Sequence, residues 1–420
     1  MSHIVAGIDV HKRLLVVSVA DASRDPLEFS CRRFGSVHSE LLQLVEWLSS
    51  LGVQDVVMES TAQYWKPVWL ALEQRFRPHL AQAQSNRAPQ GRKTDYRDAQ
   101  RLVRRFIAGE LILSFVPDAE QREIRLLARR RVQWIRDRVR LQAQLEALLE
   151  DCNIKLSSVL TDLFGVSGRR ILDALAAGKL DPAELAALGD ERLRCTTQQL
   201  ADALQSRLTA NQREVLRMSL EQLKLLDAQV ETITQLIANA VKPQQDAMLR
   251  LCQVPGIRAI AAQQILAEIG PDAKAFPSSA QLSSWAGVCP GQQESAGDNR
   301  SSRCAKGNHF LRSIICQCAQ AAVKTNNSWF QTTFRRLLPR LGYAKAIWAI
   351  AHRLCRLIWK VLHDGVHYVE HGLPPSPIAL KRRRQRLVTQ LRRIGYQVEL
   401  TPRDTQPERV IFEGVAGVGG

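Results

Sequence analysis

Four acidic residues stand where the surrounding sequence is otherwise apolar or basic. They are Asp9, Glu59, Asp95 and Asp98. Asp9 lies inside the apolar run AGIDV and Glu59 closes the run DVVME, where a buried charge is costly without a partner. Asp95 and Asp98 are three residues apart, so a helix presents both on one face. Carboxylates arranged in this way suit two hard divalent cations, Mg²⁺ or Mn²⁺, which promote phosphodiester chemistry when they lie about 3.5–4 Å apart.

Each acid also has a simpler structural explanation. Asp9 could begin a turn, Glu59 could cap a helix, and the other two could pair with neighbouring arginines. That explanation is preferred for any single acid, but two acids that interrupt apolar strands favour a metal site for the whole set. Bases surround the helical pair, as expected at a site for a polyanion. These bases are Arg87, Arg92, Lys93, Arg97, Arg101, Arg104 and Arg105.

The elements that must position these acids form a β-rich region of about 116 residues. Short β-branched runs predict strands over residues 4–10, 14–21 and 27–34, joined closely enough for an antiparallel meander. A helix, the strand DVVMES, a Trp-rich helix, the strand HLAQAQ and a helix over 94–109 follow. The order βββαβαβα predicts a mixed sheet with helices on its faces.

The rest of the chain is predicted to be helical. Apolar residues at helical spacing predict two long helices, over about 118–152 and 210–241, which suggest an antiparallel coiled-coil stalk of the kind that often serves oligomerisation. The fold class is therefore α/β plus all-α. The predicted domains are a mixed-sheet domain over 1–116, a coiled-coil region over 117–245, a helical domain over 246–345 and a basic helical extension with a tail over 346–420.

Composition favours a nucleic-acid partner. The 420 residues include 58 Lys and Arg against 41 Asp and Glu, a formal charge of +17. The arginine-rich start of the first long helix is predicted to contact phosphates through Arg122, Arg125, Arg129, Arg130 and Arg131. No signal peptide or membrane span is apparent, and nine scattered Cys without a CxxC argue against a zinc ribbon or a disulfide scaffold. A cytosolic protein is expected, with no membrane partner.

Several motifs resemble one known family. The motifs AGIDVHK, VVMEST and GRKTDYRDAQRL resemble the N-terminal RuvC-like (ribonuclease H-fold) domain of the DEDD-type insertion-sequence transposases, which are serine-dependent, bridge-RNA-guided recombinases. The motifs VPGI, WAGVCPG, ESAG and KGNHFLR resemble that family's C-terminal transposase domain. The likeness spans about residues 3–115 and 249–325. The central helical region is similar only in its position and character.

The resemblance implies a mechanism and partners. It implies that Asp9, Glu59, Asp95 and Asp98 bind Mg²⁺ or Mn²⁺ and that Ser295, in ESAG, is the nucleophile, with Ser301 and Ser302 as weaker candidates. The bases near this serine, Arg300, Arg303 and Lys306, are expected to hold phosphate, although Asp298 stands where many relatives look basic. A DNA transposase is implied, guided by an element-encoded RNA and acting as a homo-oligomer, a tetramer, in the bacterial cytosol with the nucleoid.

Other interpretations remain open. The carboxylates alone would suit a RuvC-like hydrolytic nuclease, and the charge alone would suit a non-catalytic nucleic-acid-binding protein. The turn in VPGI could be a helix–hairpin–helix, which binds phosphate through backbone amides, or a packed helical turn. His363, His367 and His371 have helical spacing that could chelate a metal, but the sequence offers no clear fourth ligand.

Overall fold

The computed structural model describes most of the chain and divides it into two compact units. The described residues are 3–59, 62–82, 95–290, 293–295, 298–301, 304, 306–370, 384–390, 392 and 397. The first unit comprises residues 1–248 together with 262–278, and the second comprises residues 249–261 together with 279–420.

A five-stranded mixed sheet forms the first part of the first unit. Its strands are β1 (Ile4–Val10), β2 (Leu14–Asp21), β3 (Ser30–Gly35), β4 (Asp55–Glu59) and β5 (Arg77–Ala81). They lie in the order β3-β2-β1-β4-β5. The strand pairs β1–β2 and β2–β3 are antiparallel, whereas β1–β4 and β4–β5 are parallel. The predicted mixed sheet, an antiparallel meander extended by parallel strands, is confirmed.

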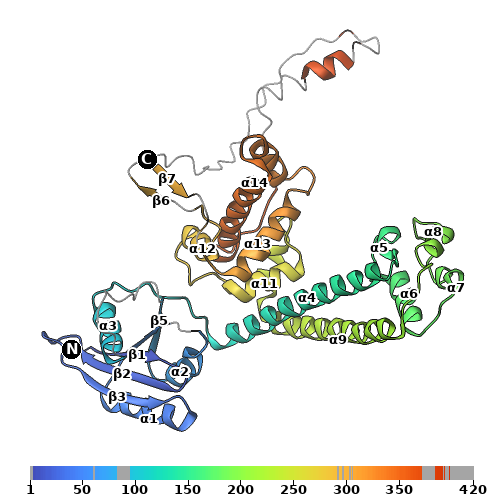
Figure 1. Ribbon diagram of the computed structural model, residues 1–420. Helices are drawn as coiled ribbons and strands as arrows, with labels where there is room; N and C mark the ends of the chain where they lie inside the picture. The colour runs from blue at the N-terminus through green and yellow to red at the C-terminus, as the bar shows by residue number, and fades with distance from the viewer. Residues whose placement is uncertain are drawn as a thin grey trace. The chain divides into compact units, whose positions relative to one another are not determined.

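Helices cover both faces of this sheet, because strand residues alternate between the faces (Figure 1). On one face Ile8, Leu15 and Met58 pack in a buried cluster with α1 (His38–Ser50) and α2 (Trp65–Leu72). On the other face α3 (Asp95–Ile107) packs through Leu102 and Val103 against Val5 and Val57. The acids predicted to bind metal therefore belong to elements that are in direct contact.

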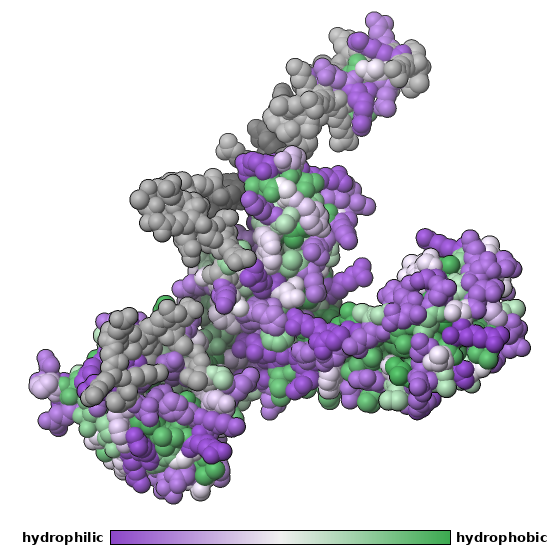
Figure 2. Space-filling model, in the orientation of Figure 1, coloured by the Kyte–Doolittle hydropathy of each residue, from purple (hydrophilic) through white to green (hydrophobic). Residues whose placement is uncertain are grey.

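Two long helices, α4 (Ala119–Asp151) and α9 (Ala210–Ala240), form a helical hairpin. Leu145 and Leu149 of α4 share a buried cluster with Leu216 and Leu220 of α9, so the end of one helix packs on the start of the other. Shorter helices complete this region: α5 (Leu156–Val159), α6 (Val166–Ala176), α7 (Pro182–Ala186) and α8 (Thr197–Asp202). The two predicted long helices are confirmed. Hydrophilic surface covers much of the hairpin in Figure 2, interrupted by apolar patches.

The remaining elements are mostly helical. They are η1 (Lys242–Gln244), α10 (Gln245–Cys252), α11 (Ala259–Ile269), α12 (Ser279–Ala286), α13 (His309–Ala322) and α14 (Trp329–His363), with a short hairpin of β6 (Gln293–Ser295) and β7 (Asp298–Ser301). In the second unit α14 packs on α12 and α13. It is kinked at Gly342, which has a φ of 72°, and the boundary expected between residues 345 and 346 falls within this helix. Among the described residues no helix is both long and apolar enough to cross a membrane.

Candidate functional site

The parallel pairing of β1 and β4 brings two of the four acids to one edge of the sheet. Ile8 is the register partner of Met58, so the next residues, Asp9 and Glu59, are neighbours. Because Ile8 and Met58 face α1 and α2, alternation directs Asp9 and Glu59 to the opposite face, where α3 lies. Helix α3 begins at Asp95 and carries Asp98 in its first turn. Two strands and one helix thus supply all four acids to the same region.

Gly7 is the reason that α3 can lie so close to β1. A Cβ atom at residue 7 would lie 2.4 Å from the carbonyl oxygen of Ala99 and 2.8 Å from a methyl group of Val103. Residue 7 shares its strand face with Asp9, and Ala99 directly follows Asp98. The missing side chain therefore sets the distance between the acid of β1 and the acids of α3.

A histidine joins this cluster of acids. His11 follows β1, and its Nε2 lies 3.1 Å from Oδ2 of Asp9 and 3.9 Å from Oδ1 of Asp95. Ligand atoms of Asp9, His11 and Asp95 all lie within 4.8 Å of one another. Asp98 is buried and accepts a hydrogen bond of 2.7 Å from Arg101. Among the described residues this is the one His, Cys, Asp and Glu grouping compact enough to hold a metal ion.

The electrostatics of the cluster favour a cation. Burial raises the pKa of the Asp9 carboxyl above its ordinary value, His11 lowers it, and the nearby Asp98, Asp95 and Glu59 raise it further. Several carboxylates near one partly buried position destabilise one another when ionised. A divalent cation would relieve that repulsion, and oxygen donors are the ligands that Mg²⁺ and Mn²⁺ prefer. The donor set therefore fits a divalent cation.

Four of the five arginines predicted to contact phosphate on α4 are engaged inside the protein. Arg122 donates to both carboxylate oxygens of Glu73, with one N–O distance of 2.6 Å. Arg129 donates to both carboxylate oxygens of Glu268 at 2.7 and 2.8 Å. Arg131 is 1% exposed and donates to Oε1 of Gln263 at 3.0 Å.

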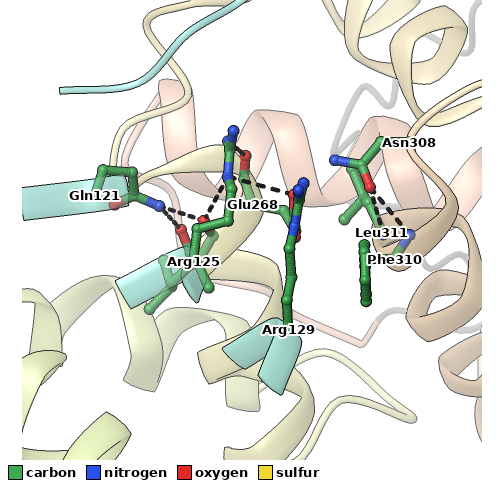
Figure 3. A network of polar contacts seen from close by, with 9 residues as sticks. Gln121, Arg125, Arg129, Glu268, Asn308, Phe310 and Leu311 are labelled. Carbon is green, nitrogen blue, oxygen red and sulfur yellow. Dashed lines mark hydrogen bonds and ion pairs between the residues drawn. The ribbon is translucent and has the colours of Figure 1, made fainter. Parts of the chain in front are cut away.

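Figure 3 shows how this network joins α4 to α11. Gln121 donates to the backbone oxygens of Leu266 and Ala267, and Arg125 donates to the backbone oxygens of Ala267 and Glu268. Burial lowers the pKa of Arg125 to about 10, although Glu268 opposes this shift. Arg122, Arg125, Arg129 and Arg131 thus have acceptors within the protein, and their contact with phosphate stays a prediction. Arg130 is exposed.

The other predicted phosphate contacts are distributed over several elements. Arg97 is exposed on α3, whereas Arg101 is bonded to Asp98. Lys306 is exposed before α13, and Arg300 belongs to β7. Arg92, Lys93 and Arg303 lie outside the described residues.

The candidate nucleophile lies on the β6–β7 hairpin. Ser295 is the last residue of β6 and pairs with Asp298, the first residue of β7. Beyond this hairpin α13 begins at His309, and the Asn308 side chain accepts hydrogen bonds from the backbone amides of Phe310 and Leu311 (Figure 3). The described residues of β6 and β7 pair as a short antiparallel hairpin. Ser301 ends β7, and Ser302 lies outside the described residues.

Two further sequence features have local partners in the structure. His363 contacts Asp364 at 2.9 Å and His367 contacts Gln253 at 3.1 Å, while His371 lies outside the described residues. The turn in VPGI packs against α13, where a Cβ at Gly256 would lie 2.3 Å from the carbonyl oxygen of Cys318. That close packing favours the packed helical turn over the helix–hairpin–helix interpretation.

Sequence reasoning missed three residues: two at the acidic cluster and one in the arginine network. His11 had a usable signal, because residues two apart on a strand point the same way and Asp9 was already a candidate. Gly7 is also two residues from Asp9, but a glycine has no side chain that would indicate a role in the site. Glu268, which binds two of the α4 arginines, had no signal, since its partners are more than 130 residues away in the sequence.

The fold and the cluster define a class: a mixed α/β sheet that presents carboxylates suited to metal-assisted phosphoryl chemistry, followed by a helical hairpin and a second unit. Comparison with known families gives two matches. Residues 6–154 match a family model of the DEDD type described as "Transposase", and residues 248–335 match the model described as "Transposase IS116/IS110/IS902 family". The chain belongs to this family of insertion-sequence transposases.

Curated relatives agree with this assignment. The chain is 29% identical over 170 residues to a "Probable family 20 transposase" of Pseudomonas aeruginosa, a match that covers 38% of this chain and 48% of the relative. It is 30% identical over 128 residues to a "Putative transposase y4pF/y4sB" of Sinorhizobium fredii, covering 28% of this chain and 32% of the relative. The matches thus span half or less of the length of these relatives.

Proposed function

We propose that the protein is a DNA transposase of an insertion sequence that cuts and rejoins donor and target DNA by a metal-assisted exchange between serine and a phosphodiester. The observation that carries this proposal is the compact cluster of Asp9, His11 and Asp95 in a chain with two transposase domains. The RuvC-like nature of the mixed sheet and the assignment of four carboxylates as metal ligands are part of the proposal.

In this function Asp9, Glu59, Asp95 and Asp98 would hold Mg²⁺ or Mn²⁺. When bound, the metal would stabilise negative charge on the scissile phosphate and on the leaving oxygen. Burial, together with the neighbouring carboxylates, raises the pKa of Asp9, which supports this role because a cation would stabilise the ionised carboxylate.

The nucleophile in this proposal is the hydroxyl of Ser295. Its oxygen forms a bond to phosphorus while the bond from phosphorus to a deoxyribose oxygen breaks, and the serine proton passes through solvent to the oxygen that leaves. The resulting phosphoserine keeps the free energy of the phosphodiester. A second DNA hydroxyl can therefore attack the phosphoserine and rejoin the strands without a nucleotide cofactor.

The partners in this proposal are donor and target DNA, a structured RNA encoded by the element, and further copies of the chain. The net charge of +17 supports binding to polyanions. Exposed apolar residues on the α4–α9 hairpin, among them Val139, Met218 and Leu225, support an oligomer, for which we propose a tetramer. We propose a bacterial cytosol, with the nucleoid, as the compartment of this reaction.

A trapping experiment tests the serine. A labelled nicked DNA substrate, from which the cut strand diffuses away, is incubated with the full chain, guide RNA and Mg²⁺. We expect a covalent protein–DNA species that mass spectrometry maps to Ser295. The Ser295→Ala variant should bind DNA normally and form no adduct, while Ser301→Ala serves as the matched control and should retain the adduct.

Two other results would change the assignment. An adduct at Ser301 or Ser302 would move the nucleophile within the same region. Metal-dependent cleavage by Ser295→Ala at the wild-type rate, with free ends, would favour a hydrolytic nuclease, which is the second candidate because the acidic cluster lies wholly within the first unit.

A further inference from the structure

His11 lies in a hydrogen-bonded turn close to the acids. The backbone amide of His11 donates to the carbonyl oxygen of Leu14 at 2.9 Å, which closes the turn between β1 and β2. The imidazole Nε2 lies 3.1 Å from an oxygen of Asp9 on the same strand and 3.9 Å from an oxygen of Asp95 on α3.

These two distances match the spacing of ligands around one ion. Mg²⁺ and Mn²⁺ bind donors at about 2.1 Å in octahedral geometry, so adjacent donors lie about 3.0 Å apart and opposite donors about 4.2 Å apart. The separation of 3.1 Å is close to the spacing of adjacent donors, and the separation of 3.9 Å lies nearer to the spacing of opposite donors. We infer that His11 is a nitrogen ligand of the same divalent cation that Asp9 and Asp95 bind, an inference that rests on the metal site of the proposed function.

A role for His11 limited to orienting Asp9 would account for only one of these two distances. A hydrogen bond to Asp9 alone would orient one carboxylate, but it would not require the imidazole to approach Asp95 as well. The side chain is 47% exposed, so burial does not force it into this position. An imidazole also alters metal preference, because nitrogen donors bind Mn²⁺ and other transition ions better than they bind Mg²⁺. The site should therefore prefer Mn²⁺ to Mg²⁺.

Electron spin-echo modulation of bound Mn²⁺ tests this ligand directly, since the method detects nitrogen nuclei coupled to the ion. The full-length protein is loaded with one equivalent of Mn²⁺. We expect imidazole nitrogen modulation in the wild type and its loss in His11→Ala. Mn²⁺ affinity should fall at least about tenfold in that variant, and Mg²⁺ affinity should fall less. His38→Ala, which removes an exposed histidine of α1, is the matched control and should retain the modulation.

The outcomes separate this inference from the proposed function. Tightly bound Mn²⁺ without nitrogen modulation in the wild type would overturn the role of His11 and leave the carboxylate site intact. Modulation that persists in His11→Ala would also overturn it. Failure of the folded wild type to bind Mn²⁺ would overturn both the inference and the metal site on which it rests. Circular dichroism of each variant confirms that the fold is retained.

Discussion

At the scale of single residues, Gly7 determines how close the acids of β1 and α3 can come. A Cβ at this position would overlap the carbonyl oxygen of Ala99, which belongs to helix backbone and cannot rotate away. We expect Gly7→Ala to push α3 from the sheet, at a cost of about 1–3 kcal/mol in unfolding free energy. Because Asp95 and Asp98 would move with α3, Mn²⁺ affinity should fall more than tenfold. Calorimetric titration and denaturant unfolding measure the two effects.

Gly35→Ala is the matched control for this change. Residue 35 ends β3 in the same sheet, and its nearest neighbour would be the flexible side chain of Glu40 at 3.1 Å. We expect that variant to keep both its stability and its metal affinity. Unaltered Mn²⁺ binding in Gly7→Ala would show that the approach of α3 is not what assembles the site.

Individual residues also show what could be predicted from sequence. Asp9 and Glu59 stood out because they interrupt strands that otherwise bury apolar residues. Arg129 and Arg131 were assigned to nucleic acid because their local sequence is basic, whereas their acceptors, Glu268 and Gln263, come from a distant helix. Local composition reveals a charge but not its tertiary partner, so the protein acceptors of these arginines could not be predicted.

At the scale of elements, Asp55 links β4 to β5 and to the start of β1, at the end of the sheet opposite the acidic cluster. It begins β4, is 5% exposed and accepts hydrogen bonds from Arg77 and His79 on β5 and from His3 before β1. Burial acts to raise the pKa of Asp55, but the hydrogen bonds from His3, His79 and Arg77 outweigh it and lower the pKa to about 2. This ionised carboxylate should stabilise the parallel half of the sheet.

The lowered pKa of Asp55 predicts how that stabilisation depends on pH. An unfolded Asp titrates near a pKa of about 3.9, so a folded pKa of about 2 means that the stabilisation is present above pH 4 and is lost as pH falls towards 2. We expect Asp55→Asn to lower the unfolding free energy at pH 7 and to differ less from wild type as pH falls through this range. Denaturant unfolding at several pH values measures this difference. Glu46→Gln, at an exposed position of α1, should change little at any pH, and a pH-independent effect of Asp55→Asn would contradict the argument.

The elements themselves were largely predictable. Hydrophobic periodicity located α4 and α9 nearly to the residue, because both helices bury residues at helical spacing, with leucines where the two helices pack on each other. The antiparallel and parallel halves of the sheet followed from short connections for the meander and helical connections for the parallel strands. The β6–β7 hairpin was not predicted, since its polar, glycine-containing sequence has no alternation of apolar residues to mark a strand.

At the scale of the whole molecule, the net charge is +17, and the basic residues fall into two groups. Some are paired with carboxylates, and others are exposed with no acid nearby in the sequence. Several arginines are paired with carboxylates at the surface, as Arg217 is with Glu214 and Glu221. Four bases in succession on α14 are exposed instead: Arg335, Arg336, Arg340 and Lys345. A phosphate must compete with a carboxylate for the paired bases, but not for exposed bases that no acid accompanies in sequence. Exposed bases should therefore make most of the contacts that release counterions from DNA.

Salt dependence measures that division. The logarithm of the DNA association constant should fall linearly with the logarithm of salt concentration, with a slope that changes by about 0.9 for each phosphate contact removed. We expect the triple variant Arg335→Gln, Arg336→Gln, Arg340→Gln to bind more weakly and to give a shallower slope. The control carries the same loss of three charges at bases that the structure pairs with acids: Arg24→Gln, Arg105→Gln, Arg217→Gln. Its slope should stay close to that of the wild type. Equal slopes in the two triple variants would mean that DNA senses only the total charge and that α14 is not a contact surface.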